Sequence, residues 1–564
     1  MRSSTKNHPA AVLRPGHEPA CESHAFFAPG ASRMRHPPSW PATVLSPGRG
    51  PLAAIALAAL LHGTAMAAAP AAATAPPSHV AWLAAAGDAD IERAFAQGKA
   101  EKKPVLVYWG AKWCPPCNQL KATLFNRQDF IERSKSFVAV NIDGDLPGAQ
   151  KLGTRFKVRG YPTMILFNPE GAEITRLPGE ADAPQVMSVL QLGLAGGRPI
   201  KAVLADARTS KPLTPNEWRM LAFYSWDTDE AQLVPEAQRA GLLAQLSAAC
   251  PASQPDSKMR LMLKALAGSN ESQGVKADAA LRERVSKLLA DPAATRSQMD
   301  VLVNYAGELV QALAPQPGKE RATLAAAFDT ALGRLQDDTT LSRADRMGAL
   351  IARVSLARID QPKDVLHPKL SESVLKQVRD EAARADREVT DGYERQAVIT
   401  SAAYLLGEAG LWKESDALLQ ASLAKSHSPY YLMSQLGGNA RKQGRNAEAL
   451  NWYAQAFDRS EGPATRLQWG ASYLSALVEL TPQDAGRIEK TAAKLIDEAA
   501  GQQGAFYERS ARAMQRVGSK LGSWNAGGKH QAAMDRLRAQ LAPVCGKLPA
   551  ADAQRATCDG MIKA

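Results

Sequence analysis

The stretch Pro104–Cys117 reads PVLVYWGAKWCPPC, and it decides the fold of the residues around it. Residues 104–109 are almost all apolar and include two valines, a tyrosine and a tryptophan, which predicts a buried strand. A short loop leads from this strand to the motif Cys114-Pro115-Pro116-Cys117, after which the pattern is helical. A Cys-x-x-Cys pair between a buried strand and a helix is typical of a redox centre.

The motif has a chemical rationale. Cys114 is expected at the N-terminus of the helix, where unpaired N–H groups and the helix dipole stabilise a thiolate. Cys117 follows one turn later and is positioned to attack a mixed disulfide on Cys114. Pro115 and Pro116 suit the first helical turn, which needs few N–H donors. The alternative is half of a zinc site, but the sequence has neither a second Cys-x-x-Cys nor a nearby histidine pair, so we expect no metal.

The surrounding sequence alternates between strands and helices. The order is βαβ, then a β-hairpin, then a helix, which predicts a mixed sheet with helices on both faces. The expected elements are a helix at 90–99, strands at 104–109 and 137–142, a helix at 114–130, strands at 164–167 and 172–177, and a helix at 182–194.

Two motifs in this segment resemble those of the thioredoxin superfamily. Trp-Cys-x-Pro-Cys after an apolar strand resembles its active site, and Gly160-Tyr161-Pro162-Thr163 before a strand resembles its cis-proline loop. The segment looks most like the C-terminal thioredoxin domain of thiol:disulfide interchange proteins and related periplasmic thioredoxin-like proteins. The resemblance implies an α/β thioredoxin fold, which we place at residues 80–197.

The resemblance also implies roles for individual residues. Cys114 is the attacking and Cys117 the resolving cysteine, Trp113 shields the site, and Pro115 and Pro116 stiffen the loop between the sulfurs.

In the second motif, Pro162 is expected to be cis and to face the sulfurs, since a prolyl bond adopts cis at modest cost. Tyr161 and Thr163 are expected to line the substrate groove, although ordinary hydrophobic packing is an equal alternative for Tyr161.

Two positions depart from the family pattern. Many thioredoxins have a buried Asp six residues before the first cysteine, and Tyr108 stands there. Their buried Lys on the next strand aligns with Ala139. Of the acidic residues nearby in the sequence, Glu101 and Asp143, neither clearly replaces the missing base. We therefore expect exchange chemistry to persist, with slower resolution by Cys117.

The first 67 residues are predicted to be a secretory signal region. An apolar run at Leu52–Leu61 follows arginines and precedes the small-x-small sequence Ala65-Met66-Ala67. The run is shorter than the ~20 residues that span a bilayer, so we favour a cleaved leader over an anchor helix. Met34 offers a second start that would give a leader of ordinary length. Residues 68–79, rich in Ala and Pro, are expected to be a linker.

Charge and composition exclude several classes of function. The chain has 564 residues and a formal charge of +12, of which six basic and two acidic residues, or +4, belong to residues 1–67. The remaining +8 is spread over about 500 residues, whereas nucleic-acid binding requires a clustered basic face. The histidines after residue 68 are isolated, and no cofactor is predicted.

The rest of the chain is predicted to be helical. We divide it into an all-helical region at 200–395, tetratricopeptide-like (TPR-like) repeats at 396–480, and C-terminal helices at 481–564. The repeat is indicated by Gly410–Ser415 and Gly444–Ala449, which align at an offset of 34 residues. A generic solenoid of helical pairs is the alternative for this stretch. Such solenoids present grooves, so we expect this region to bind protein or peptide.

Three cysteines lie outside the motif and the leader. Cys545 and Cys558, 13 residues apart, are expected to form a structural disulfide in an oxidising compartment. Closing so short a loop adds about 3 kcal/mol of stability in the chain-entropy model. Cys250 is expected to be a buried thiol.

Together these features predict a periplasmic thiol–disulfide oxidoreductase that acts on protein thiols and disulfides and has no stable membrane span after cleavage of the leader. The motif does not distinguish a reductant from an oxidant or an isomerase. One alternative is a weakly catalytic or non-catalytic thioredoxin-like/TPR scaffold. Another is an electron acceptor served by a membrane thiol:disulfide reductase.

Overall fold

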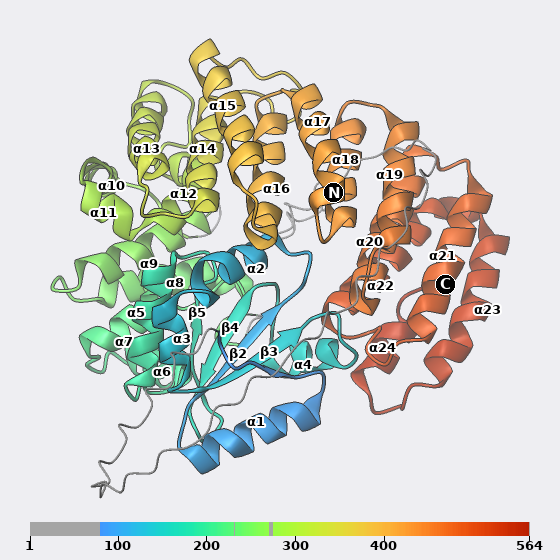
Figure 1. Ribbon diagram of the computed structural model, residues 1–564, viewed down its shortest axis with the longest axis horizontal. Helices are drawn as coiled ribbons and strands as arrows, with labels where there is room; N and C mark the ends of the chain where they lie inside the picture. The colour runs from blue at the N-terminus through green and yellow to red at the C-terminus, as the bar shows by residue number, and fades with distance from the viewer. Residues whose placement is uncertain (1–78, 230–231, 270–273, 563–564) are drawn as a thin grey trace, which may run out of the picture.

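The computed structural model describes residues 79–229, 232–269 and 274–562 (Figure 1). It consists of an α/β part, residues 79–197, and a helical part that follows it. The predicted leader at 1–67, the second start and all but one residue of the predicted linker lie outside the described residues. The mixed sheet with flanking helices and the helical remainder are as predicted.

The α/β part contains five strands and a set of short helices. The strands are β1 (Leu83–Ala84), β2 (Val105–Gly110), β3 (Val138–Asp143), β4 (Thr163–Phe167) and β5 (Glu173–Leu177). The helices are α1 (Asp88–Glu101), α2 (Pro115–Leu120), the π-helix η1 (Lys121–Phe125), α3 (Gln128–Ser134), α4 (Ala149–Phe156) and α5 (Ala183–Leu194).

The strands form one mixed sheet in the order β1-β3-β2-β4-β5. β2 runs parallel to β3 with Tyr108 opposite Asn141, and antiparallel to β4 with Tyr108 opposite Met164. β4 and β5 form the expected hairpin. The edge strand β1, parallel to β3, was not predicted, because two exposed residues carry no periodic pattern.

The central strand β2 is buried on both faces because its side chains alternate between two apolar layers. Val105, Val107 and Trp109 pack with apolar residues of α1 and α4. Leu106 and Tyr108 pack with residues of α2, η1, α3 and α5. The sheet therefore has helices on both faces, and the Cys-x-x-Cys motif follows directly after its most buried strand.

The helix after the motif is not continuous, as the prediction of one helix at 114–130 implied. α2 ends at Leu120, the next five residues form a π-helix, and α3 begins only at Gln128. The prediction was wrong here because Leu120, Leu124 and Phe125 face the sheet core in either helical form, so their spacing does not reveal the change.

The helical part contains helices throughout. The first half comprises α6 (Ile200–Arg208), α7 (Pro215–Ala222), α8 (Glu236–Ala249), α9 (Pro255–Ala267), α10 (Ala279–Ala290), α11 (Pro292–Ser297), α12 (Met299–Leu313), α13 (Lys319–Asp337), α14 (Arg343–Ala357), α15 (Glu372–Glu388) and α16 (Gly392–Glu408). The second half comprises α17 (Trp412–Ser422), η2 (Leu423–Lys425), α18 (Pro429–Lys442), α19 (Asn446–Arg459), α20 (Pro463–Leu480), α21 (Ala485–Ala500), α22 (Glu508–Trp524), η3 (Ala526–Gly528), α23 (Gln531–Gly546) and α24 (Ala553–Asp559). Among the described helices, none combines the length and the apolar character needed to cross a membrane.

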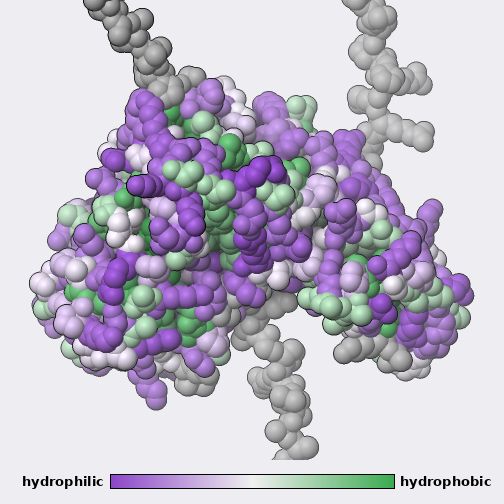
Figure 2. Space-filling view, turned by 90° about the horizontal axis from the view of Figure 1, so that it is seen from below, coloured by the Kyte–Doolittle hydropathy of each residue, from purple (hydrophilic) through white to green (hydrophobic). Residues whose placement is uncertain are grey.

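These helices form an arc around the α/β part (Figure 1). The arc runs from α7 on one side, over α13–α16, to α21–α24 on the other, and the sheet lies inside it. Helix α2 packs against α16, and α4 packs against α22. The face seen in Figure 2 is mainly hydrophilic with small scattered hydrophobic patches. The arc therefore turns its inner face toward the helix that carries the motif.

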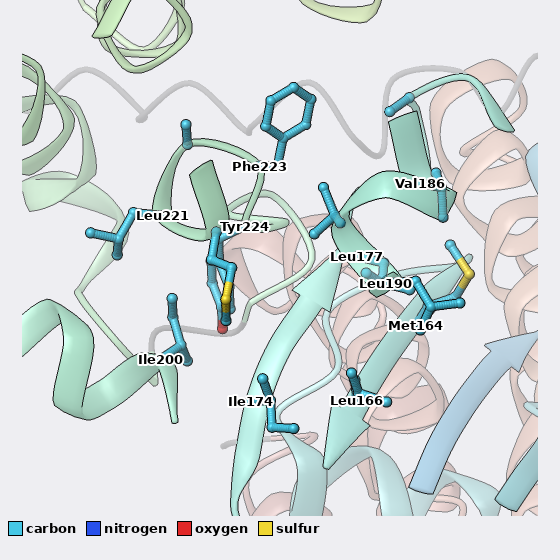
Figure 3. Close-up of a cluster of buried hydrophobic side chains, with 14 of the residues drawn as sticks. Met164, Leu166, Ile174, Leu177, Val186, Leu190, Ile200, Leu221, Phe223 and Tyr224 are labelled. Carbon is cyan, nitrogen blue, oxygen red and sulfur yellow. The ribbon is translucent and has the colours of Figure 1, made fainter. Parts of the chain in front are cut away.

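At the start of the arc, the two parts share one apolar core (Figure 3). Side chains from β4, β5 and α5 pack in the same cluster as side chains from α6, α7 and the turn after α7. The labelled members are Met164, Leu166, Ile174, Leu177, Val186, Leu190, Ile200, Leu221, Phe223 and Tyr224.

Buried ion pairs reinforce this junction. Lys264 on α9 contacts Glu180 of the α/β part at 3.0 Å and Asp227 at 2.9 Å. Nearby, the fully buried Arg260 and Asp300 form a two-bond pair that ties α9 to α12. Breaking such a pair leaves an uncompensated charge in the interior. Lys264 therefore ties α9 to the loop after β5, and Arg260 ties α9 to α12.

Farther along the arc, Gly410 and Gly444 occupy equivalent turns. Both have positive φ, at 75° and 72°, and both precede helices that begin two residues later. Glycine is favoured at such positions because it has no Cβ. The TPR-like assignment of residues 396–480 stays a prediction that this 34-residue spacing supports.

Candidate functional site

Cys114 and Cys117 lie where β2 gives way to α2. Cys114 is the N-cap of α2, and its sulfur accepts a hydrogen bond from the Cys117 N–H at 3.2 Å. The two cysteines form a disulfide with their Cα atoms 5.2 Å apart. Pro115 and Pro116 occupy the first two helical positions, where a missing N–H costs little. The arrangement places the first sulfur at the positive end of the helix.

The loop before the motif is held by Asn118, which is completely buried. Its side-chain amide donates hydrogen bonds of 2.8 Å to the carbonyls of Lys112 and Cys114. The backbone on both sides of the first cysteine is therefore fixed by a residue that the sequence analysis did not single out.

The second predicted motif lies beside the first. The Tyr161–Pro162 bond is cis, and the rings of Tyr161 and Trp113 are 6.5 Å apart. Pro162 is buried. The Tyr161 hydroxyl accepts a hydrogen bond from Gln150 on α4 at 3.0 Å. Thr163 is 1% exposed, and its hydroxyl donates to the Gly160 carbonyl, so it faces its own loop.

Trp113 is enclosed by the helical part. Its ring stacks on Tyr431 of α18 at 5.9 Å and meets Trp469 of α20 edge-on at 5.0 Å. The Arg509 guanidinium of α22 lies 4.4 Å from the same ring. The indole N–H donates to the Thr465 hydroxyl at 2.7 Å. Three helices that follow the motif by more than 300 residues therefore bind the residue that was predicted to shield it.

Asp145, just after β3, completes this contact. Its carboxylate accepts hydrogen bonds from the Thr465 N–H at 2.7 Å and from the Thr465 hydroxyl at 2.6 Å. Burial raises the pKa of Asp145 to about 6, although the bonds from Thr465 and the charge of Arg509 oppose the increase. Thr465 thus bridges Asp145 and Trp113 through one hydroxyl.

The backbone of the motif is also contacted from the arc. Gln396 on α16 donates to the Trp113 carbonyl at 3.0 Å, and His427 Nε2 lies 3.1 Å from the Lys112 carbonyl. The Lys112 ammonium is 2.8 Å from Glu461. These contacts surround the motif on the side that faces the helical part.

As a result, both sulfur-bearing residues are buried. Cys114 is 3% exposed and Cys117 is 0% exposed, and both belong to an apolar cluster that includes Tyr430, Met433 and Trp452 from the arc. These contacts from the arc could not be expected from the sequence, because the residues that make them show ordinary helical core spacing. Trp469 in particular has the pattern of a core residue, yet it packs on Trp113.

Neither position where thioredoxins carry their buried Asp and Lys holds a charged side chain in this protein. The Tyr108 hydroxyl is buried, and that burial, together with the charge of Asp143, raises the pKa of Tyr108 above its ordinary value. Ala139 is 5% exposed within the core. Burial lowers the pKa of Lys121, one turn after Cys117, although the charge of Asp143 opposes the decrease. None of these observations gives Tyr108 the properties of a base at neutral pH.

The remaining cysteines are far from this site in the chain. Cys545 on α23 and Cys558 on α24 form a disulfide, with Cα atoms 5.5 Å apart. Cys250 is a free thiol and is 1% exposed.

Comparisons with known proteins agree with this geometry. The model of the thioredoxin-like domain matches residues 91–193. The thiol:disulfide interchange protein DsbD 2 of Pseudomonas aeruginosa is 34% identical over 110 residues, which is 19% of each chain. The thioredoxin-like protein slr0233 of Synechocystis is 32% identical over 90 residues, which is 16% of this chain and 81% of the relative. The thioredoxin of Mycolicibacterium smegmatis is 35% identical over 77 residues, 14% of this chain and 66% of the relative.

The residues that match the family model, 91–193, lie within the α/β part. The chain spans about a fifth of the length of the interchange proteins that it matches. The similarity therefore concerns the segment that carries the Cys-x-x-Cys motif and the cis-proline loop.

Proposed function

Because the chain belongs to the thioredoxin-like family, we propose that it is a periplasmic thiol–disulfide oxidoreductase whose dithiol is Cys114 and Cys117. The observation that carries the proposal is the placement of Cys114 at the N-cap of α2, with Cys117 within bonding distance and the cis-proline loop alongside. The periplasmic location rests on the predicted leader at residues 1–67.

The reaction is an exchange of sulfur–sulfur bonds. The Cys114 thiolate attacks one sulfur of a protein disulfide, the substrate S–S bond breaks, and a mixed disulfide forms with release of one substrate thiolate. The Cys117 thiolate then attacks the Cys114 sulfur and releases the second substrate thiolate. The substrate gains two electrons, and the protein is left with the Cys114–Cys117 disulfide. The reverse sequence oxidises a substrate dithiol.

The other site residues support these steps. Pro115 and Pro116 hold the first helical turn, Pro162 leaves the sulfur face without a competing N–H, and Trp113 shields the sulfurs from water. Tyr161 is assigned to the substrate groove. Because Tyr108 replaces the usual buried Asp, resolution by Cys117 is expected to be slow.

The proposed partners are protein thiols and disulfides, with a membrane thiol:disulfide reductase as the electron donor. The likeness to interchange proteins over the α/β part supports this choice. We further propose that the helical part, divided at residues 200, 396 and 481, binds protein, because a curved array of helices offers an extended surface.

A scaffold function is the second candidate, and a specific observation favours it. The cysteines are 3% and 0% exposed, and the usual Asp and Lys are absent at Tyr108 and Ala139. A protein that uses the α/β part only as a packing module would show both features.

A redox titration separates the two candidates. The full chain is equilibrated with mixtures of reduced and oxidised glutathione, and the state of Cys114 and Cys117 is read by alkylation and mass spectrometry, with Cys114→Ala as the control. A midpoint near about −270 mV indicates a reductant and one near about −120 mV an oxidant. If the redox state of Cys114 and Cys117 does not change across the glutathione mixtures, the oxidoreductase proposal is rejected.

The location is tested independently. The protein is expressed with its leader, the periplasmic fraction is isolated, and the N-terminus of the recovered chain is sequenced. An N-terminus near residue 68 supports export with cleavage, whereas a full-length chain retained in the cytoplasm contradicts it.

A further inference from the structure

The contacts between the two parts differ in kind at the two ends of the arc. Near α6 and α7 the parts share a continuous apolar core with buried ion pairs (Figure 3). At the other end, α18, α20 and α22 meet the motif through Tyr431, Thr465, Trp469 and Arg509. These four residues, which we call the lid residues, meet Trp113 through ring contacts and one hydrogen bond. The first end thus combines an apolar core with buried ion pairs, whereas the second end packs its apolar side chains directly on the residues that carry the dithiol.

The lid residues occupy the space that exchange requires. Exchange requires a partner sulfur to reach the Cys114 sulfur. Cys114 is 3% exposed and lies in an apolar cluster that includes Trp469, with Tyr431 packed against it. Trp113, proposed to shield the sulfurs, and Tyr161, proposed to line the substrate groove, both lie against the Arg509 guanidinium, at 4.4 Å and 5.0 Å. A folded protein substrate and the lid residues therefore compete for the same face.

We infer that α18, α20 and α22 form a lid that autoinhibits the dithiol, and that exchange proceeds only from a form in which these helices have moved away from Trp113. This inference rests on the proposed oxidoreductase function. The closed form is held by the Thr465 hydroxyl, which joins Asp145 to Trp113, and by the aromatic face of Trp469. The shared core at α6 and α7 keeps the parts together while the far end of the arc opens.

The test compares variants of the full chain. Thr465→Val removes the bridging hydroxyl and keeps the size of the side chain. Thr491→Val is its matched control, because Thr491 on α21 is also buried and its hydroxyl donates only to the Arg487 carbonyl of its own helix. Trp469→Leu is a second lid variant, and circular dichroism checks that each variant is folded.

The readout is the second-order rate at which dithiothreitol, and separately a small reduced thioredoxin, reduces the Cys114–Cys117 disulfide. We expect Thr465→Val and Trp469→Leu to raise both rates at least tenfold, with the larger gain for the protein reductant, and Thr491→Val to match the wild type. Equal rates in the wild type and both lid variants overturn the lid. The lid is also overturned if the small thioredoxin reduces the wild-type chain as fast as it reduces the disulfide of an unfolded peptide.

The same samples distinguish failure of the lid from failure of the proposed function. If the dithiol equilibrates with glutathione in every variant but the rates do not differ, the oxidoreductase stands and the lid is rejected. If the disulfide of folded Thr465→Val and Trp469→Leu is accessible to dithiothreitol but neither variant exchanges with protein disulfides, the oxidoreductase proposal itself fails.

Discussion

The Asp145 carboxylate makes closure of the lid depend on pH. In the closed form burial raises its pKa to about 6, whereas a solvated aspartate titrates near 3.8. The closed form therefore binds a proton more tightly than the open form, and closure is strongest below pH 4 and weakens as the pH rises through 6. Between pH 7 and pH 5 this linkage strengthens closure by about 1.3 kcal/mol, or about tenfold in the closing equilibrium.

The charged and titratable groups near Asp145 do not reverse this sign. Asp143 also raises the pKa of Asp145, whereas the bonds from Thr465 and the charge of Arg509 lower it, and the net result is a pKa of about 6. Tyr161, which also interacts with Asp145, has its pKa raised by burial and so stays protonated between pH 5 and pH 7.

The assay starts from the oxidised protein, so neither active-site cysteine titrates. The rate of reduction by dithiothreitol is measured between pH 5 and pH 7 and divided by the rate for oxidised glutathione at the same pH. We expect the normalised rate of the wild type to fall about tenfold on going from pH 7 to pH 5. Asp145→Asn, which cannot titrate, should show no such fall. Parallel profiles for the two proteins would refute the assignment of closure to Asp145.

Three further predictions concern stability and the unused thiol. Asp300→Leu leaves Arg260 as a buried unpaired charge and should lower the free energy of unfolding by about 3–5 kcal/mol. The double variant Arg260→Met/Asp300→Leu should recover most of this loss. Urea titrations in which the double variant is less stable than Asp300→Leu would contradict the prediction. Replacing Cys545 and Cys558 together by serine should cost about 3 kcal/mol, measured by urea unfolding of the C-terminal helices, and an unchanged midpoint would exclude a stabilising clip. Cys250→Ser should leave the rate of exchange with glutathione unchanged, and a loss of exchange would assign that thiol a role in the reaction.

The local parts of the site could be predicted because they are encoded by neighbouring residues. The strand, the proline-filled first turn and the two cysteines lie within fourteen consecutive residues, Pro104–Cys117. Each feature has its own physical signal, namely a run of apolar side chains, missing N–H groups at a helix start, and the spacing of a resolving thiol. Strands β2 to β5 followed from the same kind of local pattern, whereas the two-residue strand β1 did not.

The contacts between the lid residues and the motif could not be predicted, because they join residues far apart in the chain. Trp113 and Thr465 are separated by 352 positions, and Asp145 and Thr465 by 320. A threonine in the first turn of a helix has many ordinary uses, and nothing in its neighbourhood indicates a partner on another helix. The π-helix after α2 was not predicted for a different reason, because apolar residues four apart fit either helical form.

The shared core at the start of the arc has a consequence for how the chain can be divided. A polypeptide ending at residue 197 would leave bare the side of β5 and α5 that Ile200, Leu221 and Tyr224 now cover. Such a fragment would expose a contiguous apolar surface and would tend to self-associate. The redox segment therefore needs the first helices of the arc to complete its own core.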